Sequence, residues 1–177
     1  MRNILGGTLV GLAAAVALLC SPAGAAAAAA GATEKLYEME VMGVQADPRS
    51  GAPLVFLRGR EDKRELTMFI GPFEAQGIIL PLQGRRPPRP YTHDLLLEVI
   101  HRLQAKVKRV VITEVRDNTY FARLILEVRG QEVTLDSRPS DAIAVALRAE
   151  APILAAEAAF VRTAPPGPAT PGEQEAP

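Results

Sequence analysis

Three alternating segments joined by two-residue turns constrain the fold of this chain more than any other feature. The segments cover residues 107–115, 120–128 and 132–136. Asp117-Asn118 and Arg129-Gly130 separate them, and Asn, Asp and Gly tolerate the left-handed backbone of two-residue hairpin loops. Strands joined so closely pair in antiparallel order. The pattern therefore predicts a three-stranded antiparallel meander in the C-terminal half.

The remaining elements are read from periodicity and turn composition. Strands are expected over residues 36–44, 53–57 and 65–70, and a short edge strand over 152–154. Helices are expected from Pro72, from a Thr92 cap and over residues 141–149. Hairpin-linked strands set apart from helices indicate an α+β fold. We predict a single compact domain over residues 34–162, with a mainly antiparallel or mixed sheet and three to four helices.

Apolar spacing predicts which side of each helix is buried. In the first helix we expect a buried side formed by Phe73, Ile78, Ile79 and Leu82, with Gly77 and Pro81 weakening the helix. The core face expected for the second helix consists of Leu96, Val99, Ile100 and Leu103.

The stretch DSRPSDAIAVAL, residues 136–147, carries more polar groups than a helix start requires. Pro139 disfavours helical geometry at Arg138, so an extended Arg138 is expected. Ser137 or Ser140 can cap the helix, and Asp141 suits its first turn. Asp136 and Arg138 remain unexplained by helix-start chemistry, which is the first indication of a site.

Both ends of the chain differ in composition from the domain. Residues 1–25 resemble a cleaved export signal, with Arg2 before an apolar run and small residues near Ala25; an uncleaved membrane anchor is the alternative. Residues 26–33 form an Ala-rich linker, and the Pro-rich residues 163–177 are expected to be disordered. Cys20 is the only cysteine, so a mature chain beginning after Ala25 has no disulfide or thiolate ligand.

A locally basic segment is the main signal for a nucleic-acid partner, because the net charge of the whole chain is +0. Residues 85–109 hold seven basic side chains, Arg86 and Arg89 among them, against two acidic ones. Such a patch can bind a phosphate backbone; the alternative is a solvated helix face. His93 sits at a helix N-terminus, where the dipole favours neutral imidazole that can act as a base or a ligand.

Carboxylates are the second chemical signal. Several of them in one cleft would bind Mg²⁺ or Mn²⁺ and activate water for phosphodiester hydrolysis. Each also has a structural explanation in a first helical turn, a hairpin or a strand end. The candidates are Glu74, Asp94, Asp117, Asp136 and Asp141. The chain has no phosphate-cradling glycine loop, nucleophile-elbow serine or HExxH pair, which argues against nucleotide-dependent enzymes and against serine and zinc hydrolases.

The blocks IGPFEAQ, PYTHDLL and RPSDAIAVALR occur in this order, and together the matching segments cover residues 39–154. In this the chain resembles the bifunctional nuclease (BFN) domain family. The resemblance implies a compact α+β domain that self-associates and cleaves DNA and RNA. It also implies that family-typical polar positions correspond to Glu74, His93, Asp94, Asp117, Asp136, Arg138, Ser140 and Asp141.

The working hypothesis is an exported nuclease and homo-oligomer, a dimer or trimer, with nucleic acid as substrate. Glu74, Asp136 and Asp141 would hold a divalent metal, Mg²⁺ or Mn²⁺. Glu74, His93, Asp94 and Asp141 are the candidate catalytic residues, with His93 as general base or water-orienting group. Arg138, Arg86, Arg89 and Ser140 would bind the substrate, with the arginines on its phosphate. The alternative is a non-catalytic oligomeric binding or scaffold domain of the same fold.

Overall fold

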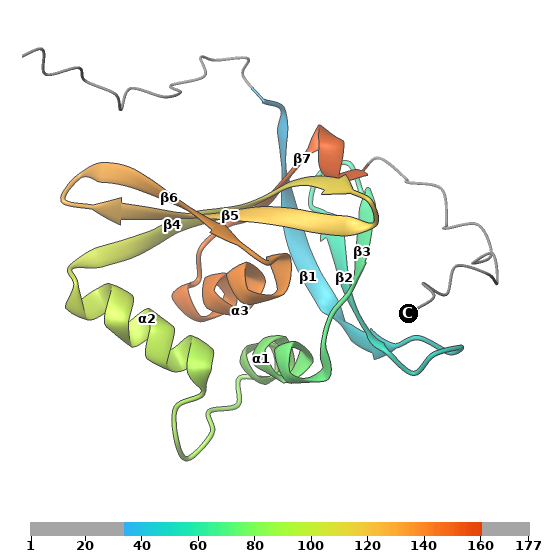
Figure 1. The fold of residues 1–177 in the computed structure, drawn as a ribbon, viewed down its shortest axis with the longest axis horizontal. Coiled ribbons are helices and arrows are strands. Elements are labelled where there is room, and N and C mark those ends of the chain that lie inside the picture. The colour runs from blue at the N-terminus through green and yellow to red at the C-terminus, as the bar shows by residue number, and fades with distance from the viewer. Residues whose placement is uncertain (1–33, 161–177) are drawn as a thin grey trace, which may run out of the picture. The chain divides into compact units, whose positions relative to one another are not determined.

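Seven strands pair into one mixed sheet in the order β3-β2-β1-β7-β4-β5-β6, which does not close into a barrel (Figure 1). The computed structural model describes residues 34–160. The expected export signal, Ala-rich linker and Pro-rich tail lie outside these residues. None of the helices in the described part is long and apolar enough to cross a membrane. The predicted α+β class is confirmed.

The C-terminal meander forms as predicted. It consists of β4 (Ala105–Arg116), β5 (Thr119–Val128) and β6 (Gln131–Ser137), paired antiparallel in sequence order. The first turn has φ of 47° at Asp117 and 61° at Asn118, and the second has 51° at Arg129 and 79° at Gly130. The turn residues therefore adopt the left-handed backbone that their chemistry predicts.

A second antiparallel meander makes up the other half of the sheet. It consists of β1 (Leu36–Ala46), β2 (Pro53–Gly59) and β3 (Glu65–Phe69). The side chain of Asp47 holds the turn after β1, because its Oδ1 accepts the backbone N–H groups of Arg49 and Ser50 at 3.0 and 2.7 Å. Such an Asx turn is a local structure that sequence composition predicts well.

The last strand corrects one expectation. We expected an edge strand over residues 152–154, but β7 (Ile153–Ala156) lies in the middle of the sheet, antiparallel to β1 and parallel to β4. Ile153, Ala155 and Ala156 are buried there. Buried interior strands are continuous apolar runs, and the sequence Ile-Leu-Ala-Ala of β7 is one. β7 thus joins the two meanders, and the 3-10 turn η1 (Glu157–Phe160) follows it.

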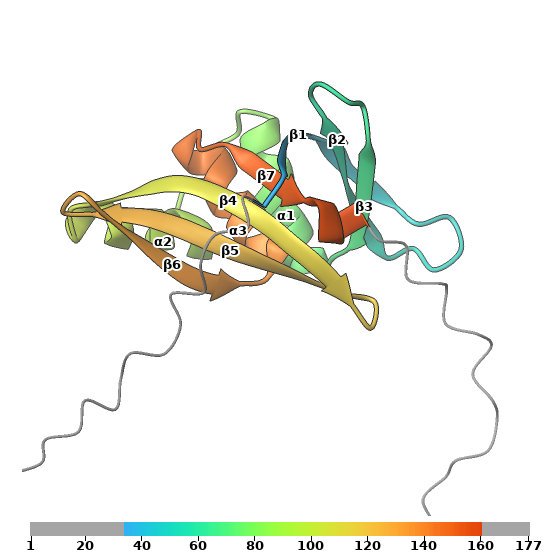
Figure 2. The same cartoon turned by 90° about the horizontal axis from the view of Figure 1, so that it is seen from above.

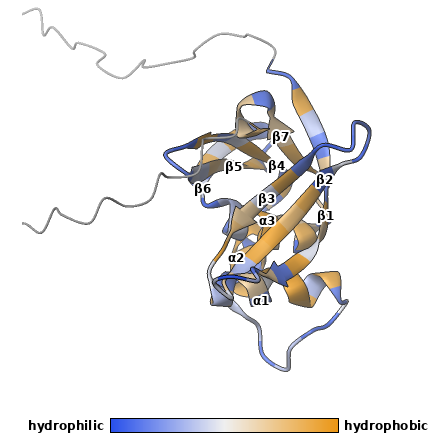
Figure 3. Ribbon diagram, turned by 90° about the vertical axis from the view of Figure 1, so that its right-hand side faces the viewer, coloured by the Kyte–Doolittle hydropathy of each residue, from blue (hydrophilic) through white to orange (hydrophobic). Residues whose placement is uncertain are grey.

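Three helices lie on one side of the sheet (Figures 1 and 2). They are α1 (Pro72–Leu82), α2 (Thr92–Arg102) and α3 (Pro139–Ala149). α3 is the central one, because it contacts α1, α2, β4 and β5 and residues 142–146 are buried. Its Ile143 and Val145 pack in one core with Ile78 of α1 and with Val110 and Ile112 of β4. The loop joining α1 to α2 projects away from this core and is coloured hydrophilic to neutral in Figure 3.

The expected apolar faces of two helices are partly wrong. In α1, Ile78 is buried, but Phe73 is exposed and so is Leu82. In α2 only Ile100 of the four expected core residues is buried; the other three, Leu96, Val99 and Leu103, are exposed. α2 instead turns Leu97 and the polar side chains of His93 and Asp94 toward the protein. The apolar stripe of α2 therefore faces solvent.

The helix caps also differ from the expectation. Tyr91, not Thr92, is the N-cap of α2, and the side chain of Asp94 accepts its backbone N–H at 2.8 Å. Arg138 is the N-cap of α3, and neither expected serine makes a capping hydrogen bond. The extended backbone predicted for Arg138 is confirmed, with φ of −66° and ψ of 140°. Ser137 lies before the N-cap and Ser140 lies inside the helix, so neither serine occupies the capping position.

Candidate active site

The first turns of all three helices line one cavity of about 560 Å³. α1 contributes Phe73 and Glu74, α2 contributes His93, and α3 contributes Asp141 together with its N-cap Arg138. Helix N-termini carry partial positive charge and unpaired N–H groups, which favour anions. The cavity therefore stabilises its own carboxylates and suits an anionic ligand.

Arg138 joins the two carboxylates of the cavity. Its Nε lies 2.7 Å from Oδ2 of Asp141, and its Nη2 lies 3.1 Å from Oδ1 of Asp141 and 2.9 Å from Oε1 of Glu74. The side chain of Arg138 is nonetheless 65% exposed. A guanidinium held in this way presents its remaining donors to solvent, as a phosphate-binding arginine requires.

His93 and Asp141 form a hydrogen-bonded pair at the wall of the cavity. Nε2 of His93 lies 3.2 Å from Oδ1 of Asp141, and the imidazole is 13% exposed. Nδ1 makes no hydrogen bond within the described residues, and every fully buried side-chain nitrogen or oxygen there has a partner, so Nδ1 keeps some contact with solvent. With Nε2 protonated toward the carboxylate, Nδ1 carries the lone pair that a general base needs.

The charge of Asp141 is set by two opposing effects. Burial raises the pKa of its carboxyl, and the hydrogen bonds from Arg138 and His93 lower it by more, so the pKa of Asp141 lies below its ordinary value. Asp141 is therefore ionised at neutral pH. An ionised carboxylate orients the imidazole and stabilises the imidazolium that forms when the base takes a proton.

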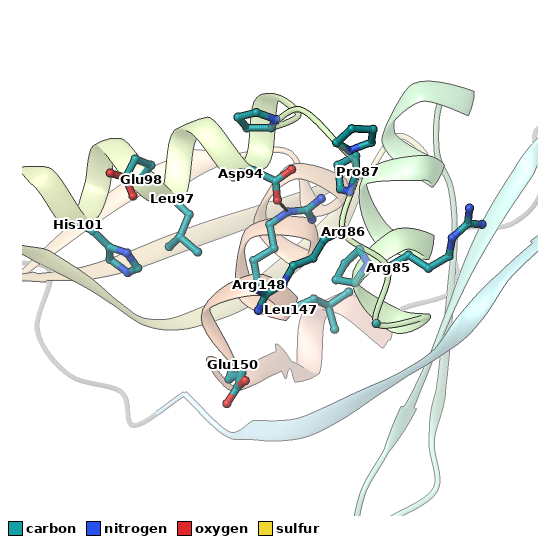
Figure 4. A pocket seen from close by; sticks show the side chains of 14 residues that line it. Arg85, Arg86, Pro87, Asp94, Leu97, Glu98, His101, Leu147, Arg148 and Glu150 are labelled. Carbon is teal, nitrogen blue, oxygen red and sulfur yellow. Dashed lines mark hydrogen bonds and ion pairs between the residues drawn. The ribbon is translucent and has the colours of Figure 1, made fainter.

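A second, buried ion pair positions the start of α2. The side chain of Arg148, 8% exposed, donates to Oδ1 of Asp94 at 2.6 Å and to the backbone oxygens of Gly77 and Ala144 at 2.6 and 2.8 Å (Figure 4). Burial raises the pKa of Asp94, but the bonds from Arg148 and from the Tyr91 N–H leave it below its ordinary value. Arg148 thus ties α1, α2 and α3 together directly behind His93.

Asp94 faces a different cavity from its sequence neighbour His93. Asp94 and Arg148 line a second cavity of about 870 Å³, which does not include His93. Within it, Asp94 is occupied by Arg148 and by the Tyr91 backbone. The geometry therefore supports Asp94 as a residue that holds α2 in place.

The other predicted site residues do not line the first cavity. Arg86 lines the second cavity with Asp94, while Arg89 is exposed and lines neither of the two. Ser140 is buried under the start of α3. Asp136 lies on the edge strand β6, opposite Arg123 of β5, and is not part of the lining. Asp117 lies in the β4–β5 turn.

The predicted metal ligands do not form a three-carboxylate set. Across residues 34–160 no group of three or more His, Cys, Asp and Glu side chains is arranged to hold a metal ion. Glu74 and Asp141 do share the cavity, but the Arg138 guanidinium lies between them, where a bridging cation would compete with it. As arranged, these residues do not fit a metal centre, so metal dependence stays a prediction.

Sequence reasoning missed three residues of the site. Phe73 and Tyr91 line the cavity, and Gly77 lies against His93. The signal for Phe73 was present: it is five residues from Ile78, about 140° around the helix, and therefore off the buried face. No local signal could have placed Gly77 beside a histidine from another helix.

Comparison with known proteins identifies relatives of the chain. The model of the bifunctional nuclease domain matches residues 55–164, which include the whole candidate site. An uncharacterized protein of Mycobacterium tuberculosis is 36% identical over 125 residues, 71% of this chain and 74% of that protein. Bifunctional nuclease 1 of Oryza sativa subsp. japonica is 37% identical over 98 residues, 52% of this chain and 30% of the rice protein.

Proposed function

This chain belongs to the bifunctional nuclease domain family, and on that premise we propose that it hydrolyses phosphodiester bonds of nucleic acid at the cavity formed by α1, α2 and α3. One observation carries the proposal: the His93–Asp141 pair and an exposed arginine share a cavity at three helix N-termini. The same residues lie within the segment that matches the family model.

In the proposed reaction His93 acts as the general base. The Asp141 carboxylate accepts a hydrogen bond from Nε2 of His93 and fixes the ring. Nδ1 can then take a proton from the water molecule that attacks phosphorus. The P–O bond to the leaving oxygen breaks, and that oxygen takes up a proton from solvent while the His93 imidazolium returns its proton to solvent. Arg138 binds the phosphate and stabilises the charge that develops on its oxygens. Glu74 holds Arg138 in position from the opposite side.

Arg86 and Arg89 contribute to binding in this proposal. Both lie on the loop between α1 and α2, and neither forms an ion pair within the described residues. Unpaired arginines on an exposed loop can contact phosphates on either side of the reacting one without reading base sequence. Binding should therefore weaken as salt concentration rises.

The test is a cleavage assay with matched variants. Purified protein is incubated with plasmid DNA, single-stranded DNA and RNA, in Mg²⁺, in Mn²⁺ and in EDTA. We expect His93→Ala and Asp141→Asn to lose about 10²–10⁴-fold of the rate, the usual contribution of a positioned base. The matched controls are His101→Ala, the other histidine of the chain, and Asp136→Asn; both should stay within about twofold of wild type.

Other outcomes have definite meanings. Full activity in both His93→Ala and Asp141→Asn would reject the site, and loss in Asp136→Asn would move it to the β5–β6 edge. Loss of activity in EDTA with recovery in Mn²⁺ would support the predicted divalent metal. No cleavage under any condition would favour the alternative, a non-catalytic binding or scaffold domain.

Self-association is a second part of the proposal. Four apolar side chains of α2 and its C-cap are exposed at helical spacing, namely Leu95, Leu96, Val99 and Leu103. A contiguous exposed apolar stripe is typical of an interface. We propose that a second copy of the chain covers it. Light scattering should show a dimer or trimer that Val99→Glu dissociates, and a monomeric wild type at high concentration would contradict this.

A further inference from the structure

Phe73 is the most exposed large apolar side chain among the described residues, at 84%. It is the second residue of α1 and points away from the core that Ile78 and Ala75 face. Burying a phenylalanine is ordinarily favourable, so folding leaves this side chain in water against its own preference. Packing within the described part of the chain gives no reason for a phenylalanine at this position.

Phe73 lies at the candidate site. It lines the same cavity as Glu74, His93, Arg138 and Asp141. Tyr91, from the start of α2, lines that cavity as well and is exposed. The ring–ring and arginine–ring contacts of the described residues involve Tyr37, Phe121 and Phe160, but neither Phe73 nor Tyr91. Two aromatic rings without ring–ring or cation–ring contacts in the described residues therefore line the cavity of the proposed reaction centre.

The surroundings favour a nucleic acid over an apolar partner. Arg85, Arg86 and Arg89 lie on the loop that leads into Pro90 and Tyr91, and none of the three forms an ion pair within residues 34–160. Arg85 and Arg86 line the neighbouring cavity, and the loop that carries all three arginines ends at the exposed ring of Tyr91. Arginines and exposed aromatic rings together bind single strands, with the cations on the backbone and the rings on the base faces. An apolar protein or lipid partner would gain nothing from three desolvated guanidinium groups.

We propose that Phe73, together with Tyr91 of the same cavity lining, is a stacking subsite for an unpaired nucleobase next to the phosphate bound by Arg138. In a duplex each base face is covered by its neighbours, so an exposed ring can stack only on a single-stranded or extruded base. The inference rests on the proposed function for its ligand class and deepens it: the preferred substrate is single-stranded DNA or RNA, with little preference among base sequences.

The chain contains no tryptophan, which allows a direct test. In Phe73→Trp the introduced indole is the only tryptophan, and stacking on a base quenches its fluorescence. Single-stranded oligothymidylate should quench it in a saturable way, whereas a blunt two-strand duplex of equal length should not. The matched control is Phe69→Trp, because Phe69 is also exposed, at 62%, but lies on β3 outside the lining of both cavities. Titrations are run in EDTA and again in Mg²⁺ at low temperature, with strand integrity checked on a gel.

A second variant measures the contribution to affinity. Phe73→Ala removes an exposed side chain, so the fold is retained, and binding of a labelled single strand should weaken about tenfold, as expected for loss of one stacked base. Duplex affinity should change less than twofold. Equal quenching by single strand and duplex, or equal quenching at positions 73 and 69, would overturn the proposal.

Failure of this inference and failure of the nuclease proposal give different results. Selective quenching with no cleavage in any metal would support the subsite and reject the nuclease. Cleavage without selective quenching would reject the subsite and leave the nuclease proposal in place. Absence of both binding and cleavage would reject both.

Discussion

Gly77 of α1 leaves the space that the imidazole of His93 occupies: a Cβ atom added at Gly77 would lie 2.8 Å from both Cε1 and Nδ1 of that ring. Real Cβ atoms do not approach heavy atoms so closely, so one group has to move. The ring is the far end of a side chain, and α1 is fixed by its packing on α3. A side chain at position 77 would therefore displace His93 from Asp141 before it disrupted the fold.

We expect Gly77→Ala to lower the cleavage rate at least tenfold while the protein stays folded. Two-dimensional NMR would follow the mechanism independently of activity, because the chain has only two histidines. The Hε1 resonance of His93 should shift, and that of His101, on the exposed end of α2, should not. An unshifted His93 resonance would contradict the packing argument.

Combining Gly77→Ala with His93→Ala tests the contact between positions 77 and 93 through protein stability. In a helix interior, Gly→Ala ordinarily stabilises by about 1 kcal/mol. We expect little or none of this gain when Gly77→Ala is made in the wild type, because the ring must move. With His93→Ala the space is free, and the full gain should appear in urea unfolding. Additive effects of the two substitutions would rule out the contact.

Arg138 should matter more for activity than for stability. The Arg138 side chain is 65% exposed, and ion pairs of an exposed arginine contribute about 0–1 kcal/mol. Arg138→Lys keeps the charge but loses the planar fork that binds phosphate bidentately. We expect a rate loss of at least tenfold with a change in unfolding free energy below about 1 kcal/mol. A cleavage rate that falls only in proportion to the unfolding free energy would indicate a structural role alone.

Arg148 should show the opposite behaviour. Its side chain is buried, and its removal takes a donor away from the Asp94 carboxylate and from two backbone oxygens. Breaking one side of a buried pair costs about 3–5 kcal/mol, so Arg148→Met should lower the midpoint of urea unfolding markedly. Arg102→Met is the matched control, since its pair with Glu98 spans one exposed helical turn and should change stability by less than about 0.5 kcal/mol. Similar effects of the two substitutions would contradict this account.

The pH dependence of stability should reveal the ionised Asp141. Its pKa in the folded protein is lowered, because the bonds from Arg138 and His93 outweigh the effect of burial. The carboxylate therefore stabilises the fold at pH values above the ordinary aspartate pKa of about 3.9, and this contribution disappears as the pH falls through the lower folded-state pKa. The stability difference between wild type and Asp141→Asn should be largest near pH 7 and shrink toward pH 3.

The control for this titration uses Arg138→Met. In that background the carboxylate loses its strongest hydrogen-bond partner. The difference made by Asp141→Asn should then be smaller at pH 7 and should vary less with pH. A difference of the same size in both backgrounds would show that Arg138 does not set the charge of Asp141.

The sequence by itself determined the local structure of this protein. The alternation of β4, β5 and β6 and the left-handed turns at Asn118 and Gly130 depend on neighbouring residues only, and so do the helix starts at Pro72 and Pro139. The same is true of the extended backbone at Arg138. Such features follow from steric limits within a few residues, so composition and spacing suffice to predict them.

Only the tertiary structure decided where these elements lie and what they do together. The apolar stripe of α2 carries the periodicity of a core face, yet it is exposed, because α2 packs through Leu97, His93 and Asp94 instead. A short apolar run became the central strand β7, and Gly77 proved to be the space for His93. The residues of the stretch from Asp136 to Leu147 lie in two places. Arg138 and Asp141 line the cavity with Glu74 and His93, whereas Asp136 lies on the edge strand β6. Burial and long-range contact arise from the packing of distant segments, and no periodicity within one segment records which face its neighbour will cover.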